Sequence, residues 1–218
     1  LPVTAAYIIL AILTAPALAG ILADSIIVEH LIQGITDPGK AAFFALVDSP
    51  HAAKVGTGML REEAVALMGA MPFELAITVR PLLVDPTLQA GFLLTAHLII
   101  FWLSQDSNVT PPVCLAAFAA AGIAGSKPMA TGFQSWKIAK GLYIIPLMFA
   151  YTPLITGEWF EVLQIGFFGL FGIYAVNAMI QFYAEGPIGI LSVPLLVVGG
   201  AGAFWPLHLA ANITGAVL

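Results

Sequence analysis

A short polar run, Ser104–Pro112, interrupts an otherwise apolar part of the sequence. It contains the side-chain oxygens of Ser107, Asn108 and Thr110, and neutral oxygens of this kind coordinate small hard cations. Asp106 adds a carboxylate, and an acid within an apolar membrane segment is by default a functional residue. These residue types predict a site for a small cation, with sodium as the occupant that needs no titrating group.

Pro111 and Pro112 should end the helix before them, because neither has an amide hydrogen and the residue before a proline becomes extended. A new helix can begin on these prolines, and its partially positive N-terminus favours an anion. Discontinuous helices with two such ends form the binding sites of secondary transporters. The run therefore predicts a cation at one helix end and an anion at the other.

The two flanks of the polar run are each too short to cross a bilayer. Leu88–Leu103 and Val113–Ala124 would form about 24 Å and about 18 Å of helix, whereas the hydrocarbon core is about 30 Å thick. The lengths favour one helix broken near its middle, or a re-entrant hairpin, over an ordinary turn outside the membrane. His97 lies two turns before Ser104 on the same face, so it either lines the same cavity or packs between helices.

The composition of the whole chain places these segments in membrane lipid. Of its 218 residues 60% are hydrophobic and only 9% are charged, whereas a soluble domain has about 25% charged residues. The net charge of −5 gives no reason to expect a nucleic-acid partner. There is one cysteine, Cys114, and neither His-Glu-x-x-His nor Gly-x-Ser-x-Gly occurs, so we expect no enzyme and no cofactor apart from an ion.

Apolar stretches of spanning length indicate the membrane helices. Val3–Ala23, Phe160–Tyr183 and Pro187–Trp205 each qualify, whereas Gly141–Thr156 is apolar but short and contains prolines. The tail Pro206–Leu218 is too short to span alone and is predicted to be a re-entrant piece or a truncated helix.

Asp24–Gln89 differs from the rest, because it holds eight of the twelve acids and four of the seven bases. Aspartate or serine before proline, at 37–38, 49–50 and 85–86, is typical of helix starts. Arg61–Met71 has apolar residues at three- and four-residue spacing and predicts an amphipathic helix. We therefore expect an all-α polytopic membrane protein in four parts: a membrane helix at 1–23, a helical surface insertion at 24–89, a broken helix and the following span at 90–156, and C-terminal membrane helices at 157–218.

Positive charge suggests the orientation of the chain. Lys127, Lys137 and Lys140 lie in one short loop, and short basic loops stay in the cytoplasm. Counting spans from that loop puts the Asp24–Gln89 insertion on the outer side, although its own four bases weigh against this.

Four runs of the sequence are specific enough to suggest a family. They are Leu1–Tyr7, Ala15–Leu18, Asn108–Gly125 (Asn-Val-Thr-Pro-Pro-Val-Cys-Leu-Ala-Ala-Phe-Ala-Ala-Ala-Gly-Ile-Ala-Gly) and Ser126–Phe133 (Ser-Lys-Pro-Met-x-Thr-Gly-Phe). Together they resemble the large membrane subunit of tripartite ATP-independent periplasmic (TRAP) transporters, in particular the fused permease of the branch with TAXI-type solute-binding proteins. The resemblance covers residues 1–23 and 95–205.

The resemblance implies a fold and a function. Such permeases are elevator-type secondary transporters with inverted repeats, of which this chain would supply the second repeat and two extra C-terminal spans. They couple sodium to the import of a small organic anion, which a periplasmic solute-binding protein delivers, through the bacterial cytoplasmic (inner) membrane. Pro2 and Thr4 would belong to a hairpin tip that faces the break at Asp106–Pro112. The N-terminal permease half would be a required partner, so this chain alone is not expected to transport.

Several alternatives stay open at this point. Asp106 is the only acid placed to carry a proton, so proton coupling is the lesser alternative to sodium. The Asp24–Gln89 insertion departs from the family pattern and either adds to the docking surface for the binding protein or has only a packing role. From another functional class, the chain would be a non-transporting helical scaffold or assembly subunit.

Overall fold

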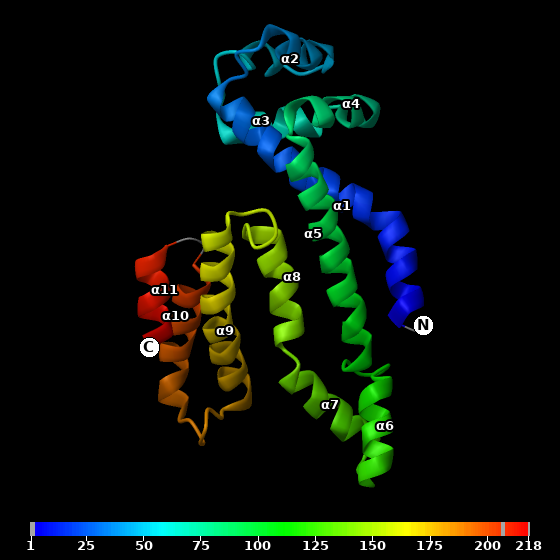
Figure 1. Cartoon of the computed structure of the whole chain (residues 1–218), viewed down its shortest axis with the longest axis vertical. Coiled ribbons are helices and arrows are strands. Elements are labelled where there is room, and N and C mark those ends of the chain that lie inside the picture. Colours follow the sequence, from blue (N-terminus) through cyan, green and yellow to red (C-terminus); the bar gives the residue numbers. More distant parts are fainter. Residues whose placement is uncertain (1–2, 206–207, 218) are drawn as a thin grey trace. The chain divides into compact units, whose positions relative to one another are not determined.

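The computed structural model describes residues 3–205 and 208–217, and every regular element in this part of the chain is a helix (Figure 1). Among the described residues, three helices are long and apolar enough to cross a membrane: α1, α5 together with the turn η3, and α9. This agrees with the predicted class of membrane protein. In chain order the elements are α1 (Val3–Gln33), α2 (Pro38–Ala42), η1 (Phe43–Leu46), η2 (Ala52–Lys54), α3 (Arg61–Gly69), α4 (Phe73–Leu83), α5 (Pro86–Gln105), η3 (Asp106–Asn108), α6 (Leu115–Ala124), α7 (Pro128–Ile138), α8 (Gly141–Tyr151), α9 (Trp159–Gln181), η4 (Ile190–Ser192), α10 (Val193–Phe204) and α11 (Leu209–Val217).

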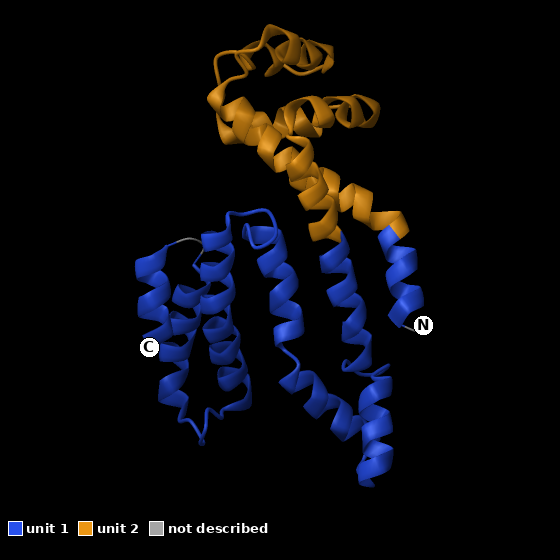
Figure 2. Ribbon diagram, in the orientation of Figure 1, with its two compact units in different colours: residues 1–11, 97–218 blue, residues 12–96 orange. Residues whose placement is uncertain are grey.

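The helices form two compact units (Figure 2). Unit 1 contains residues 1–11 and 97–218, and unit 2 contains residues 12–96. The boundaries predicted at 23/24 and 89/90 both fall inside helices. The predicted end of the first helix at Ala23 was too early, because Ile27 and Leu31 continue its buried face and the helix runs on to Gln33.

Unit 2 has an apolar core of its own. Five large side chains in this core, from four different helices, have no exposed surface: Ile27, Leu31, Phe44, Leu67 and Val79. Burying a side chain of this size contributes about 1.5–3 kcal/mol. The amphipathic helix predicted at 61–71 is confirmed as α3, which turns Ala64 and Leu67 inward.

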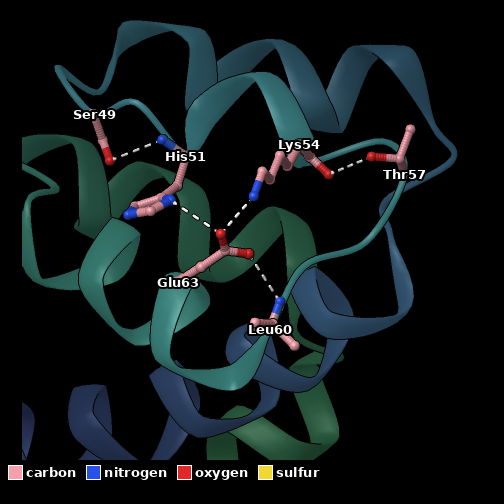
Figure 3. A network of polar contacts seen from close by, with 6 residues as sticks. All are labelled: Ser49, His51, Lys54, Thr57, Leu60 and Glu63. Atoms are coloured by element: carbon pink, nitrogen blue, oxygen red, sulfur yellow. Dashed lines mark hydrogen bonds and ion pairs between the residues drawn. The ribbon is translucent and has the colours of Figure 1, made fainter.

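A polar network on the surface of unit 2 joins η2 to α3 (Figure 3). Glu63 is at its centre: Oε1 accepts a hydrogen bond from Lys54 Nζ at 2.5 Å and lies 3.7 Å from His51 Nδ1. The other oxygen, Oε2, accepts a hydrogen bond from the amide of Leu60 at 3.0 Å and so closes the first turn of α3. The hydrogen bond from Lys54 is the main cause that lowers the pKa of Glu63, so this carboxylate is charged at neutral pH.

Two of the three predicted helix starts are confirmed. Asp37 accepts hydrogen bonds from the amides of Gly39 and Lys40 at the start of α2, and Asp85 accepts one from the amide of Thr87 at the start of α5. Ser49 accepts only a 3.4 Å bond from the amide of His51, and the short 3₁₀ turn η2 follows instead of an α-helix.

Two glycines allow the segment that follows α1 and the segment that precedes α3 to pass close to each other. Gly34 and Gly58 have φ angles of 89° and 84°, a region that other residues rarely adopt. A Cβ atom on Gly58 would lie 2.6 Å from the carbonyl oxygen of Ile32, and one on Gly34 would lie 2.9 Å from the amide nitrogen of Gly58. This close approach holds the segment before α3 against the end of α1.

The C-terminal helices α9, α10 and α11 pack on one another within unit 1. Asn212 of α11 is 3% exposed and joins all three. Its Nδ2 donates to the carbonyl oxygens of Gly202, Ala203 and Trp205 at the end of α10, at 3.1, 3.0 and 2.8 Å. Its Oδ1 accepts a 2.8 Å hydrogen bond from Gln164 Nε2 of α9. The polar atoms of this buried amide are therefore satisfied inside the protein.

The single span predicted at Pro187–Trp205 was wrong. The chain turns at Phe182–Gly189 and passes through the 3₁₀ turn η4, so α10 keeps 12 residues, about 18 Å of helix. Pro194, in the first turn of α10, is suited to a helix start and not to the middle of a longer helix. The tail is short, as predicted: α11 has nine described residues.

The basic segment around Lys137 is not the short loop that was predicted. Pro128 starts the helix α7, with Lys127 as its N-cap residue, and Lys137 lies in its last turn. Lys140 then precedes α8, which is apolar and short, as expected for 141–156.

Candidate functional site

The helix α5 carries the start of the polar run at its C-terminal end. It has 20 residues, about 30 Å, so the prediction that Leu88–Leu103 is too short to span was wrong. Asp85 caps its first turn, and at the other end the buried Ser104 donates its hydroxyl to the carbonyl of Ile100 at 2.8 Å and remains helical. The run therefore begins at the end of a helix of spanning length, not near the middle of one.

Between α5 and α6 lies a break of six residues, Val109–Cys114, that follows the short turn η3. The amide of Thr110 donates to the carbonyl oxygen of Asp106 at 3.0 Å, and a cis peptide bond joins Pro111 to Pro112. The next helix begins at Leu115, later than the predicted start on the prolines. With ten residues, about 15 Å, α6 is shorter than a span, as predicted.

A chain of hydrogen bonds closes this break from the side of α7 and α8. Thr110 Oγ1 donates to Asp106 Oδ1 at 2.9 Å and lies 2.7 Å from the hydroxyl of Tyr143. Trp136 Nε1 donates to the same Tyr143 oxygen at 3.1 Å. Trp136 Nε1 can only donate. If Tyr143 in turn donates to Thr110, and Thr110 to the Asp106 carboxylate, each of the two hydroxyl groups accepts one hydrogen bond and donates one. Both hydroxyls of the network are thus satisfied, and the chain of hydrogen bonds ends on Oδ1 of Asp106.

Lys140 adds the opposite charge to this network. Its Nζ lies 3.0 Å from the centroid of the Trp136 ring and 5.2 Å from that of Tyr143. A cation over an aromatic face is attracted by the ring quadrupole. The ammonium group is also close enough to interact electrostatically with Asp106. The break is therefore bordered by one negative and one positive side chain.

The remaining polar side chains of the run fold back onto the end of α5. Ser107 Oγ donates to the carbonyl of Ser104 at 3.0 Å, and Asn108 Nδ2 makes a long 3.5 Å bond to Gln105 Oε1. Both bonds use hydrogens, so oxygen lone pairs of Ser107 and Asn108 stay available to a cation. The structure thus brings Ser104, Asp106, Ser107, Asn108 and Thr110 together within two turns.

His97 pairs with the first helix. Its Nδ1 lies 3.1 Å from the hydroxyl of Tyr7, whose ring also packs edge-on against Phe101 with 5.7 Å between centroids. The beginning of α1 therefore lies beside the last turns of α5. Thr4 is exposed in the first turn of α1, three residues before Tyr7, and Pro2 lies outside the described residues.

The close approach of α7 to the break depends on Gly132, which is buried. A Cβ atom at this position would lie 2.6 Å from Cys114 Sγ and 3.2 Å from Pro111 Cγ. Cys114 is fully buried and is the N-cap residue of α6, so it packs as a small apolar residue. The contact sets how near Trp136 comes to the polar run.

Three residues of the network, Trp136, Lys140 and Tyr143, were not among the predicted site residues. Their spacing of four and three residues puts two aromatic rings on either side of a lysine. That pattern in the basic segment was a usable signal for one face, but it does not indicate which part of the chain the face contacts. No protein family, curated protein or solved structure was found to match this chain, so its site is known from its own residues.

Proposed function

We propose that this chain belongs to a sodium-coupled permease that imports a small organic anion through the bacterial inner membrane. The observation that carries the proposal is the break between α5 and α6. There a carboxylate and several hydroxyl and amide oxygens gather at the end of an apolar helix of spanning length.

The cation would bind at the α5 side of the break. The C-terminal carbonyls of a helix carry partial negative charge, and Asp106 adds a full one. The oxygens of Ser107, Asn108 and Thr110 are the neutral ligands that a hard monovalent ion accepts. Sodium suits this set better than a proton does, because hydroxyl, amide and carbonyl oxygens coordinate it without any titrating group.

The anion would bind at the α6 side. No side chain caps the N-terminus of α6. The amide of Leu115 bonds to the carbonyl oxygen of Val113, so the next amides, those of Ala116 and Ala117, would receive the anionic group. Lys140 supplies positive charge next to the break. The sequence resemblance adds the rest of the proposal: elevator-type inverted repeats, a further permease half and a periplasmic solute-binding protein that delivers the anion.

Sodium-selective stabilisation of the purified 218-residue chain tests the ion site. A ligand that binds only the folded state raises its stability by RT ln(1 + [L]/Kd), about 2.7 kcal/mol at a hundredfold excess over Kd. We expect the midpoint of thermal unfolding to rise in sodium chloride relative to potassium chloride at equal ionic strength. Thr110→Ala should abolish this difference. Thr131→Ala should keep it, because Thr131 lies in α7 and its hydroxyl bonds to that of Ser126.

A panel of small mono- and dicarboxylates then tests the anion site. Binding of the two ligands to one site is reciprocal, so the transported anion should lower the sodium concentration needed for half-maximal stabilisation. Equal unfolding midpoints in sodium and potassium, unchanged by Thr110→Ala, would contradict the permease. That result would favour the scaffold alternative, in which the polar run only holds helices together.

A further inference from the structure

A groove in unit 2 runs between α1, α4 and α5. It encloses about 360 Å³. One side is apolar and made mostly of small residues, and the other side ends in the side chains of Arg80 and Gln89. Its lining residues on the two long helices are Pro16, Ala19, Gly20, Ala23, Gln89, Ala90 and Leu93.

Arg80 is held at this groove by Asp24 of α1. Its Nε and Nη2 donate to Asp24 Oδ1 and Oδ2, both at 2.8 Å, in a two-pronged ion pair. The hydrogen bond to Asp24 raises the pKa of Arg80, so the guanidinium is always charged. Its Nη1 takes no part in either bond and lies against Gly20, 2.9 Å from where a Cβ atom would be. The small residue at position 20 therefore gives the guanidinium room beside the groove.

The ion pair lies where the uncharged part of α1 ends. Asp24 is the first charged residue along this helix and follows a stretch of 21 residues from Val3 without charge. Such a stretch is long enough to cross the core. From Ala23 to Pro16 the groove descends along the uncharged part for about 10 Å. A bilayer crossed by this uncharged stretch would have its headgroups at the Arg80 end of the groove and its acyl chains at the Pro16 end.

The rim of the groove on α4 is suited to lipid as well. Phe73 and Ile77 are 69% and 48% exposed, at four-residue spacing with Pro81, although the inner face of α4 is buried in the core of unit 2. An exposed apolar row on a helix that leads within three residues into the membrane helix α5 meets the interface, where such rows embed.

From these features we propose that the groove is a phospholipid site. The phosphate accepts hydrogen bonds from Arg80, and one acyl chain lies along Ala19, Ala90 and Leu93. The hydrogens on Arg80 Nη1, which the ion pair with Asp24 does not use, are the donors offered to the phosphate. The site is independent of the transport proposal, because none of its residues belongs to the α5–α6 break.

Native mass spectrometry of the detergent-purified chain, titrated with phosphatidylglycerol, tests the apolar part. Ala19→Phe fills the groove and should lower lipid retention about tenfold, the equivalent of about 1.4 kcal/mol. Ala17→Phe makes the same change two residues away at an exposed position of α1 outside the groove, and should retain lipid like the parent chain. Equal retention by these two variants would refute the groove as the binding place.

The headgroup contact is tested by variants of opposite effect. Arg80→Gln should weaken retention of phosphatidylglycerol about tenfold, since a hydrogen bond to a charged group is lost. Asp24→Asn should strengthen it, because the guanidinium then has no competing carboxylate, and diacylglycerol, which has no phosphate, should not respond. If Asp24→Asn lowers retention of both lipids equally, Arg80 is only a structural partner of Asp24 and the proposal is wrong.

Discussion

Replacing Gly132 with alanine should disturb the contact between α7 and the break. The new methyl carbon would lie 2.6 Å from Cys114 Sγ and 3.2 Å from Pro111 Cγ, whereas non-bonded heavy atoms prefer about 3.5–4.0 Å. Part of the structure must therefore move by about 1 Å, and Cys114 has no free space because it is fully buried. Overpacking of this kind costs about 1–3 kcal/mol. For a chain of this length, each kcal/mol lowers the unfolding midpoint by about 2–4 °C.

Thermal unfolding of the purified chain measures this cost. Gly122→Ala is the matched control: it lies in α6 with nothing within 4 Å of an added Cβ atom, so it should be neutral or stabilise by up to about 1 kcal/mol. Cys114→Ala removes the atom that clashes, and we expect it to rescue Gly132→Ala with a coupling of at least about 1 kcal/mol. If Gly132→Ala behaves like Gly122→Ala, or if the effects of the pair simply add, the described contact is not present.

Three further variants probe the network and unit 2 by thermal unfolding. Tyr143→Phe removes a hydroxyl shared by two hydrogen bonds and should cost about 1–2 kcal/mol; an unchanged midpoint would count against the network. The pKa of Glu63 is lowered in the folded chain, so its contribution is present above about pH 4.5, its ordinary value, and is lost as the pH falls through the folded pKa. Glu63→Gln should therefore flatten the acid limb of stability against pH, and Glu62→Gln, on an exposed residue, should not. Phe44→Ala should cost about 3–5 kcal/mol, and Leu46→Ala, which is 70% exposed, much less; similar losses for both would contradict the core of unit 2.

Local signals predicted much of the fold. The span at Phe160–Tyr183 matches α9 within two residues, since a long apolar stretch, with Glu161 as its one charged residue, needs no information from elsewhere. Asp37 and Asp85 cap helices as expected, because a capping side chain bonds to amides only two or three residues away. Helix lengths were less predictable, and α5 shows why: Ser104 stays helical by donating to a carbonyl of the preceding turn, which its residue type does not reveal.

The candidate site divides in the same way. Asp106 and Thr110 are four residues apart, so their contact followed from the sequence. Tyr143 lies 33 residues beyond Thr110 and reaches it only because Gly132 lets α7 approach the break. No pattern within either segment specifies that approach. For the same reason the lipid groove, formed by three separate helices, could not be read from any one of them.

The amide of Asn212 has a consequence for how the chain is inserted into a membrane during synthesis. Asn212 donates to three carbonyl groups at the end of α10, of which that of Gly202 also accepts from the amide of Trp205, and this side chain is made later, in α11. Unpaired carbonyls in hydrocarbon cost several kcal/mol each, so α10 has no stable place in lipid until α11 emerges. The two helices should therefore leave the insertion machinery together, as a hairpin that packs against α9. Gln164 of α9 then donates its hydrogen bond to Asn212 Oδ1. A nascent chain arrested before Asn212 should still be held at the translocon.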